Sequence, residues 1–137
     1  VIAEILNDRL NFARQAKQLI LQPMSSSIDL RKYLYENSFT IIEEKIALEG
    51  EKFYEIIIAK SGQEIVIEDE LYFEVSQAIR RNRDLNTKRF IQRKIRVTEK
   101  IIQQILKNSD QFTAEKMKEL EIRLEKLKEV AINANKL

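Results

Sequence analysis

The sequence predicts an α/β protein that ends in a pair of long helices, and three observations support this. A short aliphatic run at Gln18–Gln22 is followed by a helical pattern at Ile28–Asn37. Two runs rich in β-branched and aromatic residues come next, at Phe39–Leu48 and Lys52–Lys60, and they predict strands. From Asn86 onward the apolar residues recur at alternating intervals of four and three, which predicts helices that pack along a seam.

The first element is a helix over residues 1–15. Its apolar side chains share one helical face, and they are Ile2, Ile5, Leu6, Leu10 and Ala13. The pattern is already running at Val1, and native chains seldom begin inside an amphipathic helix without a cap. We therefore expect this chain to be the closing portion of a longer protein.

The aliphatic run Gln18–Gln22 is interpreted as a buried strand because it stops at Pro23, a residue that cannot donate to a strand ladder. A helix over Ile28–Asn37 follows it. Parallel strands need a crossover of this kind, whereas a tight turn at Gly50 requires an antiparallel pair. The elements therefore predict a mixed β-α-β-β sheet that closes with an antiparallel hairpin.

The two hairpin strands differ in character. The strand at Phe39–Leu48 is interrupted by Glu43, Glu44 and Lys45, so we expect it at an edge of the sheet. The strand at Lys52–Lys60 is almost continuously apolar, so we expect it to be central and buried on both faces.

The C-terminal segments 88–107 and 113–134 each contain a heptad seam. The seam residues are Ile91, Ile95, Thr98, Ile102 and Ile105, then Met117, Leu120, Leu124, Leu127, Ala131 and Ala134. A short polar break between them predicts an antiparallel coiled-coil hairpin. We expect Ile95, Ile102 and Ile105 to pack against Leu120, Leu124 and Leu127. Two domains follow, at 1–75 and 76–137.

Composition excludes several classes of site. The chain has no cysteine and no histidine, which removes disulfides, thiolate metal ligands and the commonest general base. We expect no metal. Only two glycines occur, at Gly50 and Gly62, so no glycine-rich loop can approach a cofactor's phosphate or amino-acid group. The apolar runs are too short to span a membrane, so a cytoplasmic protein is expected.

Positive charge is concentrated in one part of the chain. The net charge is +2, but residues 1–79 carry a net −6, while residues 80–100 carry nine basic and two acidic side chains. Such a density is typical of a surface that binds a polyanion, although a solvated helix face that balances the acidic half is the alternative. The candidate nucleic-acid ligands are Arg80, Arg81, Arg83, Lys88, Arg89, Arg93, Lys94 and Arg96.

A second candidate lies where the first strand ends. Ligands of open α/β sheets bind at the carboxyl ends of strands, and Gln22 comes directly after Leu21. Its amide could bond the edge of a nucleobase. The alternative is that Gln22 only satisfies backbone groups in the turn.

A resemblance rests on Leu19–Pro23 (LILQP), on the pattern LRxxLxENxF that begins at Leu30, and on the hairpin that ends in KFYEIIIAK. With a helix before them and a helical hairpin behind, these segments resemble the bacterial tRNA (adenine-N1)-methyltransferase family called TrmK. The likeness is strongest over Ala3–Lys60, and the closing β-α-β-β arrangement is characteristic of Rossmann-like methyltransferases.

The resemblance implies an enzyme that uses S-adenosyl-L-methionine to methylate N1 of adenine 22 in tRNA. Gln22 and Pro23 would line the base pocket, and the basic hairpin would bind tRNA. Two departures matter: Met24 stands where the family usually has Asn, and the family's first strands, with the cofactor loop, have no counterpart here. We therefore expect no cofactor-binding residue and no activity in this chain alone. The alternative is a non-catalytic tRNA-binding or coiled-coil adaptor module.

Overall fold

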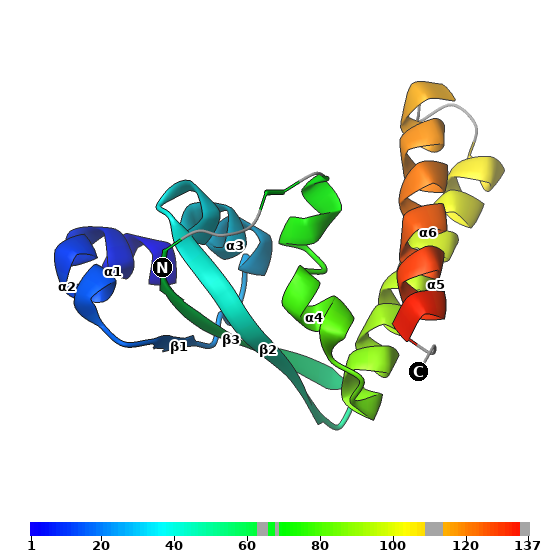
Figure 1. Cartoon of the computed structure of the whole chain (residues 1–137). Coiled ribbons are helices and arrows are strands. Elements are labelled where there is room, and N and C mark those ends of the chain that lie inside the picture. Colours follow the sequence, from blue (N-terminus) through cyan, green and yellow to red (C-terminus); the bar gives the residue numbers. More distant parts are fainter. Residues whose placement is uncertain (63–65, 68, 109–113, 135–137) are drawn as a thin grey trace. The chain divides into compact units, whose positions relative to one another are not determined.

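The computed structural model describes residues 1–62, 66–67, 69–108 and 114–134. The chain forms two compact units, Val1–Asn82 and Arg83–Leu137 (Figure 1). The expected division was at 75/76, whereas helix α4 (Gln77–Arg81) belongs to the first unit. The reason is local: the Asn82 amide donates to the backbone carbonyl of Glu44 at 2.9 Å, and the Ser76 hydroxyl donates to the Glu44 carboxylate.

The first unit begins with two short helices rather than one. Helix α1 spans Ile2–Asp8 and helix α2 spans Leu10–Gln15. The single helix expected over 1–15 is wrong because the backbone at Arg9 leaves the helical region, with φ −127° and ψ 38°. After α2 the elements are β1 (Leu19–Leu21), α3 (Ser27–Glu36), β2 (Phe39–Glu49), β3 (Lys52–Ser61), the 3₁₀ helix η1 (Glu70–Phe73) and α4.

The three described strands form one sheet in the order β1-β3-β2. Strand β3 pairs antiparallel with both neighbours, Ile58 lying opposite Ile20 of β1 and opposite Glu43 of β2. The central place expected for β3 is confirmed. The mixed sheet was expected because β1 and β2 are joined by a crossover helix. They do run in the same direction, but β3 separates them, so every described pair is antiparallel.

The β2–β3 hairpin closes around a two-residue loop, because Glu49 pairs with Lys52. Gly50 has φ +61°, a left-handed conformation that glycine adopts without a Cβ clash. The tight turn expected there is confirmed. A residue with a Cβ would be strained at this position although no neighbouring atom lies within 4 Å.

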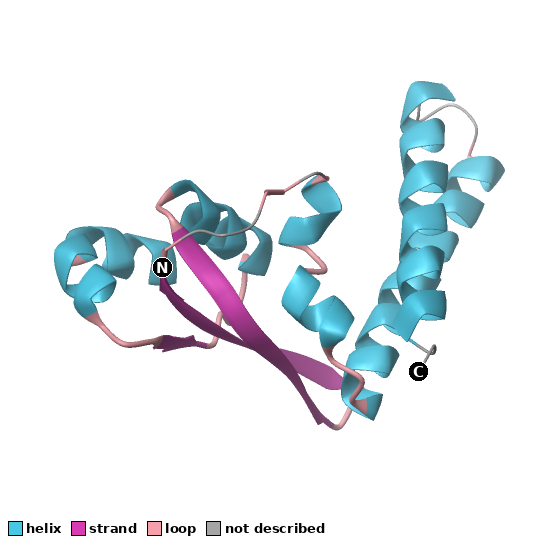
Figure 2. Cartoon of the chain, in the orientation of Figure 1, coloured by secondary structure: helices cyan, strands magenta, loops and turns pink. Residues whose placement is uncertain are grey.

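The core of the first unit lies on one face of the sheet. Helices α1, α2 and α3 cover it, and its buried residues are Leu6, Ala13, Leu30, Leu34, Phe39, Ile57 and Ala59. On the other face of β3, Ile56 and Ile58 are only half-buried. The expectation that β3 is buried on both faces is therefore wrong, since the core with α1, α2 and α3 lies on the face of Ile57 and Ala59. The strands of this sheet are drawn in magenta in Figure 2.

The second unit consists of α5 (Leu85–Lys107) and α6 (Ala114–Ala134), which pack against each other. Arg83 donates to the backbone carbonyl of Asn133 at 2.7 Å, so the start of α5 lies beside the end of α6. The expected seam residues fall on the inner faces: Ile91, Ile95, Thr98, Ile105, Leu127 and Ala134 are buried, while Ile102, Leu120 and Leu124 are half-buried. None of the helices in the described part of the chain is long and apolar enough to cross a membrane.

Candidate nucleic-acid interface

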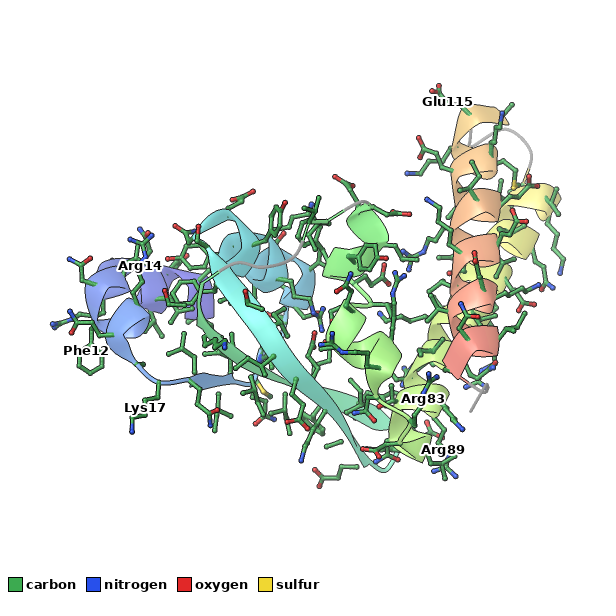
Figure 3. All side chains as sticks on the ribbon, in the orientation of Figure 1. Phe12, Arg14, Lys17, Arg83, Arg89 and Glu115 are labelled. Atoms are coloured by element: carbon green, nitrogen blue, oxygen red, sulfur yellow. The ribbon has the colours of Figure 1, made fainter. Side chains whose placement is uncertain are left out.

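Helix α5 presents a row of four cations, which we call the cationic stripe: Arg89, Arg93, Arg96 and Lys100. All four side chains are exposed. Their spacing of four, three and four residues places them within about 60° of one another around a helix of 3.6 residues per turn. At a rise of 1.5 Å per residue, the stripe extends over about 16 Å. Its start is visible at the labelled Arg89 in Figure 3.

The cationic stripe lies on the side of α5 that faces away from α6. Ile91, Ile95 and Thr98 are buried, with exposed fractions of 1%, 6% and 1%. At 100° per residue, these positions are about half a turn from the stripe. The helix therefore separates its two roles, since the apolar face packs and the opposite face displays charge to solvent.

The other five basic residues expected at the interface lie outside the cationic stripe. Arg80 and Arg81 are part of the first unit. The Arg80 guanidinium carbon lies 4.0 Å from the centre of the Tyr72 ring, and its Nε donates to the carbonyl of Val75 at 2.9 Å. Lys94 Nζ lies 4.6 Å from the Phe90 ring centre, and Lys88 is half-buried. Arg83, bonded to α6, is the fifth such residue.

Lys100 belongs to the stripe, although it was not among the expected nucleic-acid ligands. It was counted in the basic segment of residues 80–100 but not among the candidate ligands. The signal was available in the spacing, because Lys100 continues the interval of three to four residues that joins Arg89, Arg93 and Arg96.

The expected base pocket lies at the end of β1. Gln22 is exposed and comes directly after the strand, whereas Pro23 is buried. Met24 has 72% of its surface exposed. Ser26, just before α3, has φ 56°, an uncommon left-handed conformation for a residue other than glycine. The structure thus brings a flexible amide and a rigid proline to the carboxyl end of a strand, the usual place for a ligand in an α/β sheet.

A buried ionic cluster lies inside the first unit, and sequence reasoning did not find it. The Arg31 guanidinium donates to Glu44 through Nε at 3.1 Å and through Nη2 at 2.7 Å. It also donates to Glu55 at 2.8 Å and to the carbonyl of Phe73 at 3.0 Å. Ser76 donates its hydroxyl to Glu44. The cluster joins α3, both strands of the hairpin and the segment that leads into α4.

The electrostatics of the cluster keep Arg31 charged. Burial by itself lowers the pKa of Arg31, but the carboxylates of Glu44 and Glu55 raise it, and the net pKa shift is upward. With four hydrogen bonds to protein groups, the guanidinium is committed to the fold. We therefore assign it a structural role and not a ligand-binding one.

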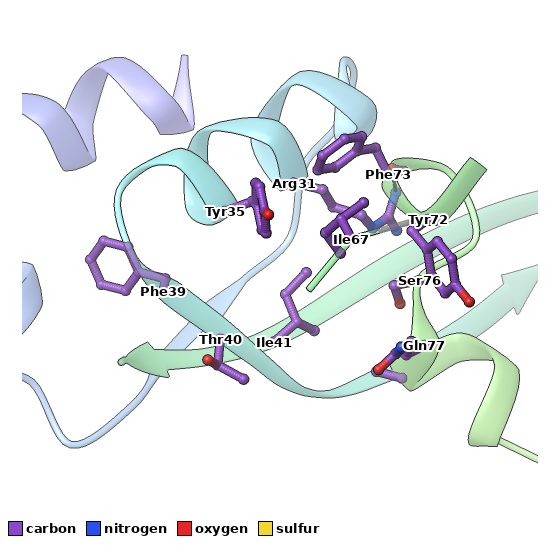
Figure 4. A pocket seen from close by; sticks show the side chains of 11 residues that line it. Arg31, Tyr35, Phe39, Thr40, Ile41, Ile67, Tyr72, Phe73, Ser76 and Gln77 are labelled. Atoms are coloured by element: carbon purple, nitrogen blue, oxygen red, sulfur yellow. Dashed lines mark hydrogen bonds between the residues drawn. The ribbon is translucent and has the colours of Figure 1, made fainter. Parts of the chain in front are cut away.

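A small pocket lies beside the cluster, lined by aromatic side chains that include Tyr35, Phe39, Tyr72 and Phe73 (Figure 4). Its volume is about 50 Å³. Sites for drug-sized ligands measure roughly 300–1,000 Å³, so a nucleotide does not fit without rearrangement. Among the described residues no group of three or more acidic, cysteine or histidine side chains could hold a metal ion.

The same arrangement occurs in solved structures. Streptococcus pneumoniae Sp1610 superimposes with a TM-score of 0.80 and 27% identity, and the match covers 95% of this chain and 56% of that one. A structure of Sp1610 in complex with S-adenosyl-L-methionine gives a TM-score of 0.74 and 25% identity, covering 95% of this chain and 54% of that one. The fold class is therefore that of Rossmann-like methyltransferases.

A match to a family model assigns the chain more specifically than the fold class does. The model of the TrmK family, described as tRNA (adenine(22)-N(1))-methyltransferase, matches residues 1–129. The chain belongs to this family. The tRNA (adenine(22)-N(1))-methyltransferase of Bacillus subtilis (strain 168) is 29% identical over 136 residues, covering 95% of this chain and 57% of that protein. The chain thus spans little more than half the length of the relatives that it matches.

Proposed function

We propose that this chain is the sheet-closing and tRNA-binding portion of an S-adenosyl-L-methionine-dependent methyltransferase that acts on N1 of adenine 22 in tRNA. The family match and the relatives support the reaction and the cofactor. The observation that supports a tRNA-binding role for this chain is the cationic stripe, four exposed cations in one row on α5. The chain alone has no glycine-rich loop, and we propose that it does not methylate by itself.

The proposed reaction needs little acid–base catalysis from the protein. When bound, S-adenosyl-L-methionine would supply an electrophilic methyl group to adenine N1, which has a lone pair to accept it, and S-adenosylhomocysteine would be the leaving group. The protein must extrude the base and align N1 with the methyl group. Gln22 and Pro23, at the carboxyl end of β1, are proposed to line the base pocket, with the Gln22 amide bonding the base edge.

The second unit is proposed to hold the tRNA backbone. Its helices would act as an antiparallel coiled coil whose seam is apolar and whose outer face is basic. A stripe of about 16 Å matches a few consecutive phosphates of an RNA strand, and phosphate contacts of this kind fix position without reading sequence. RNA helices are recognised mainly by shape and backbone, which suits a straight row of cations.

The test removes the charge at Arg89, Arg93 and Arg96 together by substitution with Gln. The logarithm of tRNA affinity falls with the logarithm of salt by about 0.7 to 0.9 per contacted phosphate. We expect the triple variant to flatten this slope by roughly two to three units. Its melting temperature should stay close to wild type, because exposed charges contribute little to stability.

A matched control removes three exposed cations from α6, with Lys118, Lys126 and Lys128 each replaced by Gln. This control lowers the net charge equally, so an equal loss of slope in both variants would mean that net charge alone attracts tRNA. A wild-type slope in the stripe variant would favour the adaptor module instead. Unfolding of the stripe variant would mean that these arginines balance the acidic half of the chain.

A further inference from the structure

Two apolar side chains of α5, Val97 and Ile101, are exposed directly beside the cationic stripe. They expose 48% and 39% of their surfaces, and we call the pair the apolar margin. At 100° per residue, both lie about a quarter turn from the centre of the stripe, on the same side of it. They are four residues apart, so the apolar margin runs parallel to the stripe over about 6 Å.

The cationic stripe is bordered differently on its other side. There α5 carries polar residues, since Gln92 and Gln103 are exposed and Glu99 is half-buried. These three positions lie about a quarter turn or less from the centre of the stripe, in the opposite sense. The middle of α5 therefore shows three parallel strips: apolar side chains, then cations, then amides and a carboxylate.

The apolar margin is short, because the same side of α5 is closed nearer the start of the helix. Phe90 lies on this side but is only 7% exposed, and Lys94 Nζ is 4.6 Å from the centre of its ring. An open length of about 6 Å corresponds to roughly two stacked nucleotides at about 3.4 Å each. By itself the margin is too small for a stable protein–protein interface.

An RNA strand has a similar division between charged and apolar surface. Its phosphates run along one side, and its bases lie on the other. In a paired helix the base faces are stacked on one another, so a protein meets mainly phosphates and ribose hydroxyls. Burying these hydroxyls against apolar side chains would leave them without hydrogen bonds. An unpaired nucleotide instead offers the face of its base, which packs well on apolar groups.

We infer that the apolar margin binds unpaired nucleotides of the RNA strand whose phosphates lie along the cationic stripe. The inference rests on the proposed function, because it takes tRNA as the polyanion at the stripe. Charge complementarity identifies the occupant: a partner that covers Val97 and Ile101 must also place negative charges along the neighbouring row of cations, and an RNA strand does so at every nucleotide. The margin also sets the direction of the bases, toward Ile101 and away from Glu99.

The test combines Val97→Thr with Ile101→Thr, which puts hydroxyls in place of apolar groups without changing the charge. Affinity is measured for tRNA and for a fully paired RNA duplex of the same length, over a range of salt concentrations. We expect the double variant to bind tRNA about fivefold to tenfold more weakly at every salt concentration, because apolar contacts release no counterions. Its salt slope and its affinity for the duplex should equal those of the wild type.

Ile132→Thr is the matched control for the single change Ile101→Thr, because Ile132 is also exposed, at 59%, but lies on α6. It should leave both affinities unchanged, and all variants should keep the wild-type melting temperature. A second measurement does not depend on the threonine variants. A benzophenone amino acid in place of Ile101 should cross-link to unpaired nucleotides of tRNA, whose positions are read by primer extension.

Unchanged tRNA affinity in the double variant would overturn the inference and leave a protein partner as the occupant. An equal loss of affinity for tRNA and duplex, or cross-links confined to paired nucleotides, would overturn it as well. The proposed function fails in a different readout, since the stripe variant changes the salt slope whereas the margin variants shift a line of the same slope. A steep wild-type slope that only the stripe variant flattens would uphold the proposed function and contradict this inference.

Discussion

Arg31 and Arg89 are the same side chain in two opposite settings. Arg31 is 2% exposed and donates four hydrogen bonds, to Glu44, Glu55 and the Phe73 carbonyl. Arg89 lies exposed in a row with three other cations of α5. The first unit thus buries an arginine among carboxylates and a carbonyl, and the second displays arginines on an exposed helix face.

The comparison shows that the basic side chains of the two units lie in different environments, one buried and ion-paired and the other exposed. A guanidinium taken out of water needs excellent partners, because the desolvation penalty is several kcal/mol. Glu44 and Glu55 raise the pKa of Arg31 despite its burial, so the guanidinium keeps its positive charge inside the first unit. The exposed side chains of the cationic stripe incur no such penalty.

The largest expected effect comes from breaking the buried cluster. Replacing Glu44 with Ala leaves the Arg31 guanidinium without its bidentate partner, which should cost about 3–5 kcal/mol of unfolding free energy in the first unit. Urea denaturation followed by circular dichroism measures this. The control is Glu43→Ala, an exposed neighbour on the same strand, which should change stability by less than about 0.5 kcal/mol. Equal effects at the two positions would contradict the structural role of the cluster.

The second prediction tests the apolar seam of the other unit. Leu127 is fully buried and Leu124 half-buried, so Leu127→Ala should cost about 2–5 kcal/mol and Leu124→Ala clearly less. Leu106→Ala is the control, because Leu106 is 69% exposed and should tolerate truncation. Thermal unfolding of the three variants gives the ranking. A greater loss at Leu124 than at Leu127 would mean that the seam is rotated from the one described.

Much of the fold could be predicted from local patterns, because strands, the Gly50 turn and the helical seams each depend on neighbours in sequence. The break at Arg9 was missed because the apolar spacing of residues 1–15 continues across it. Order within the sheet depends on pairing between distant segments, which a single sequence does not record. Hence the place of β3 between β1 and β2 was foreseen only as a central strand.

A candidate site could be predicted from the sequence when its residues lie close together along the chain. The cationic stripe could be found from spacing on one helix. Glu44 was interpreted as a polar interruption of an edge strand, yet it is buried, because its partner Arg31 lies on another element. A charged residue in a strand is ordinarily a sign of exposure, and no local pattern reports a partner elsewhere in the chain. The same limit explains why Arg80 was grouped with the nucleic-acid ligands.

The last prediction has the smallest expected effect. It compares an exposed basic side chain of the stripe with one that makes contacts inside the first unit. Lys100→Gln removes one exposed cation from the stripe and should flatten the salt dependence of tRNA binding by about 0.7 to 0.9 of a unit, with no change in melting temperature. Arg80→Gln removes a guanidinium that stacks on Tyr72 and bonds the Val75 carbonyl. It should instead destabilise the first unit by about 1 kcal/mol and leave the slope unchanged.

Each of these two variants is therefore the control for the other, since both remove a single positive charge. Salt titrations of tRNA affinity and urea denaturation are measured on both proteins under identical conditions. If Arg80→Gln flattens the slope and Lys100→Gln does not, tRNA contacts the first unit at α4, and the stripe on α5 is a solvated face. If both flatten it equally, the footprint extends beyond the stripe, and Arg80 leaves its contact with Tyr72 when tRNA binds.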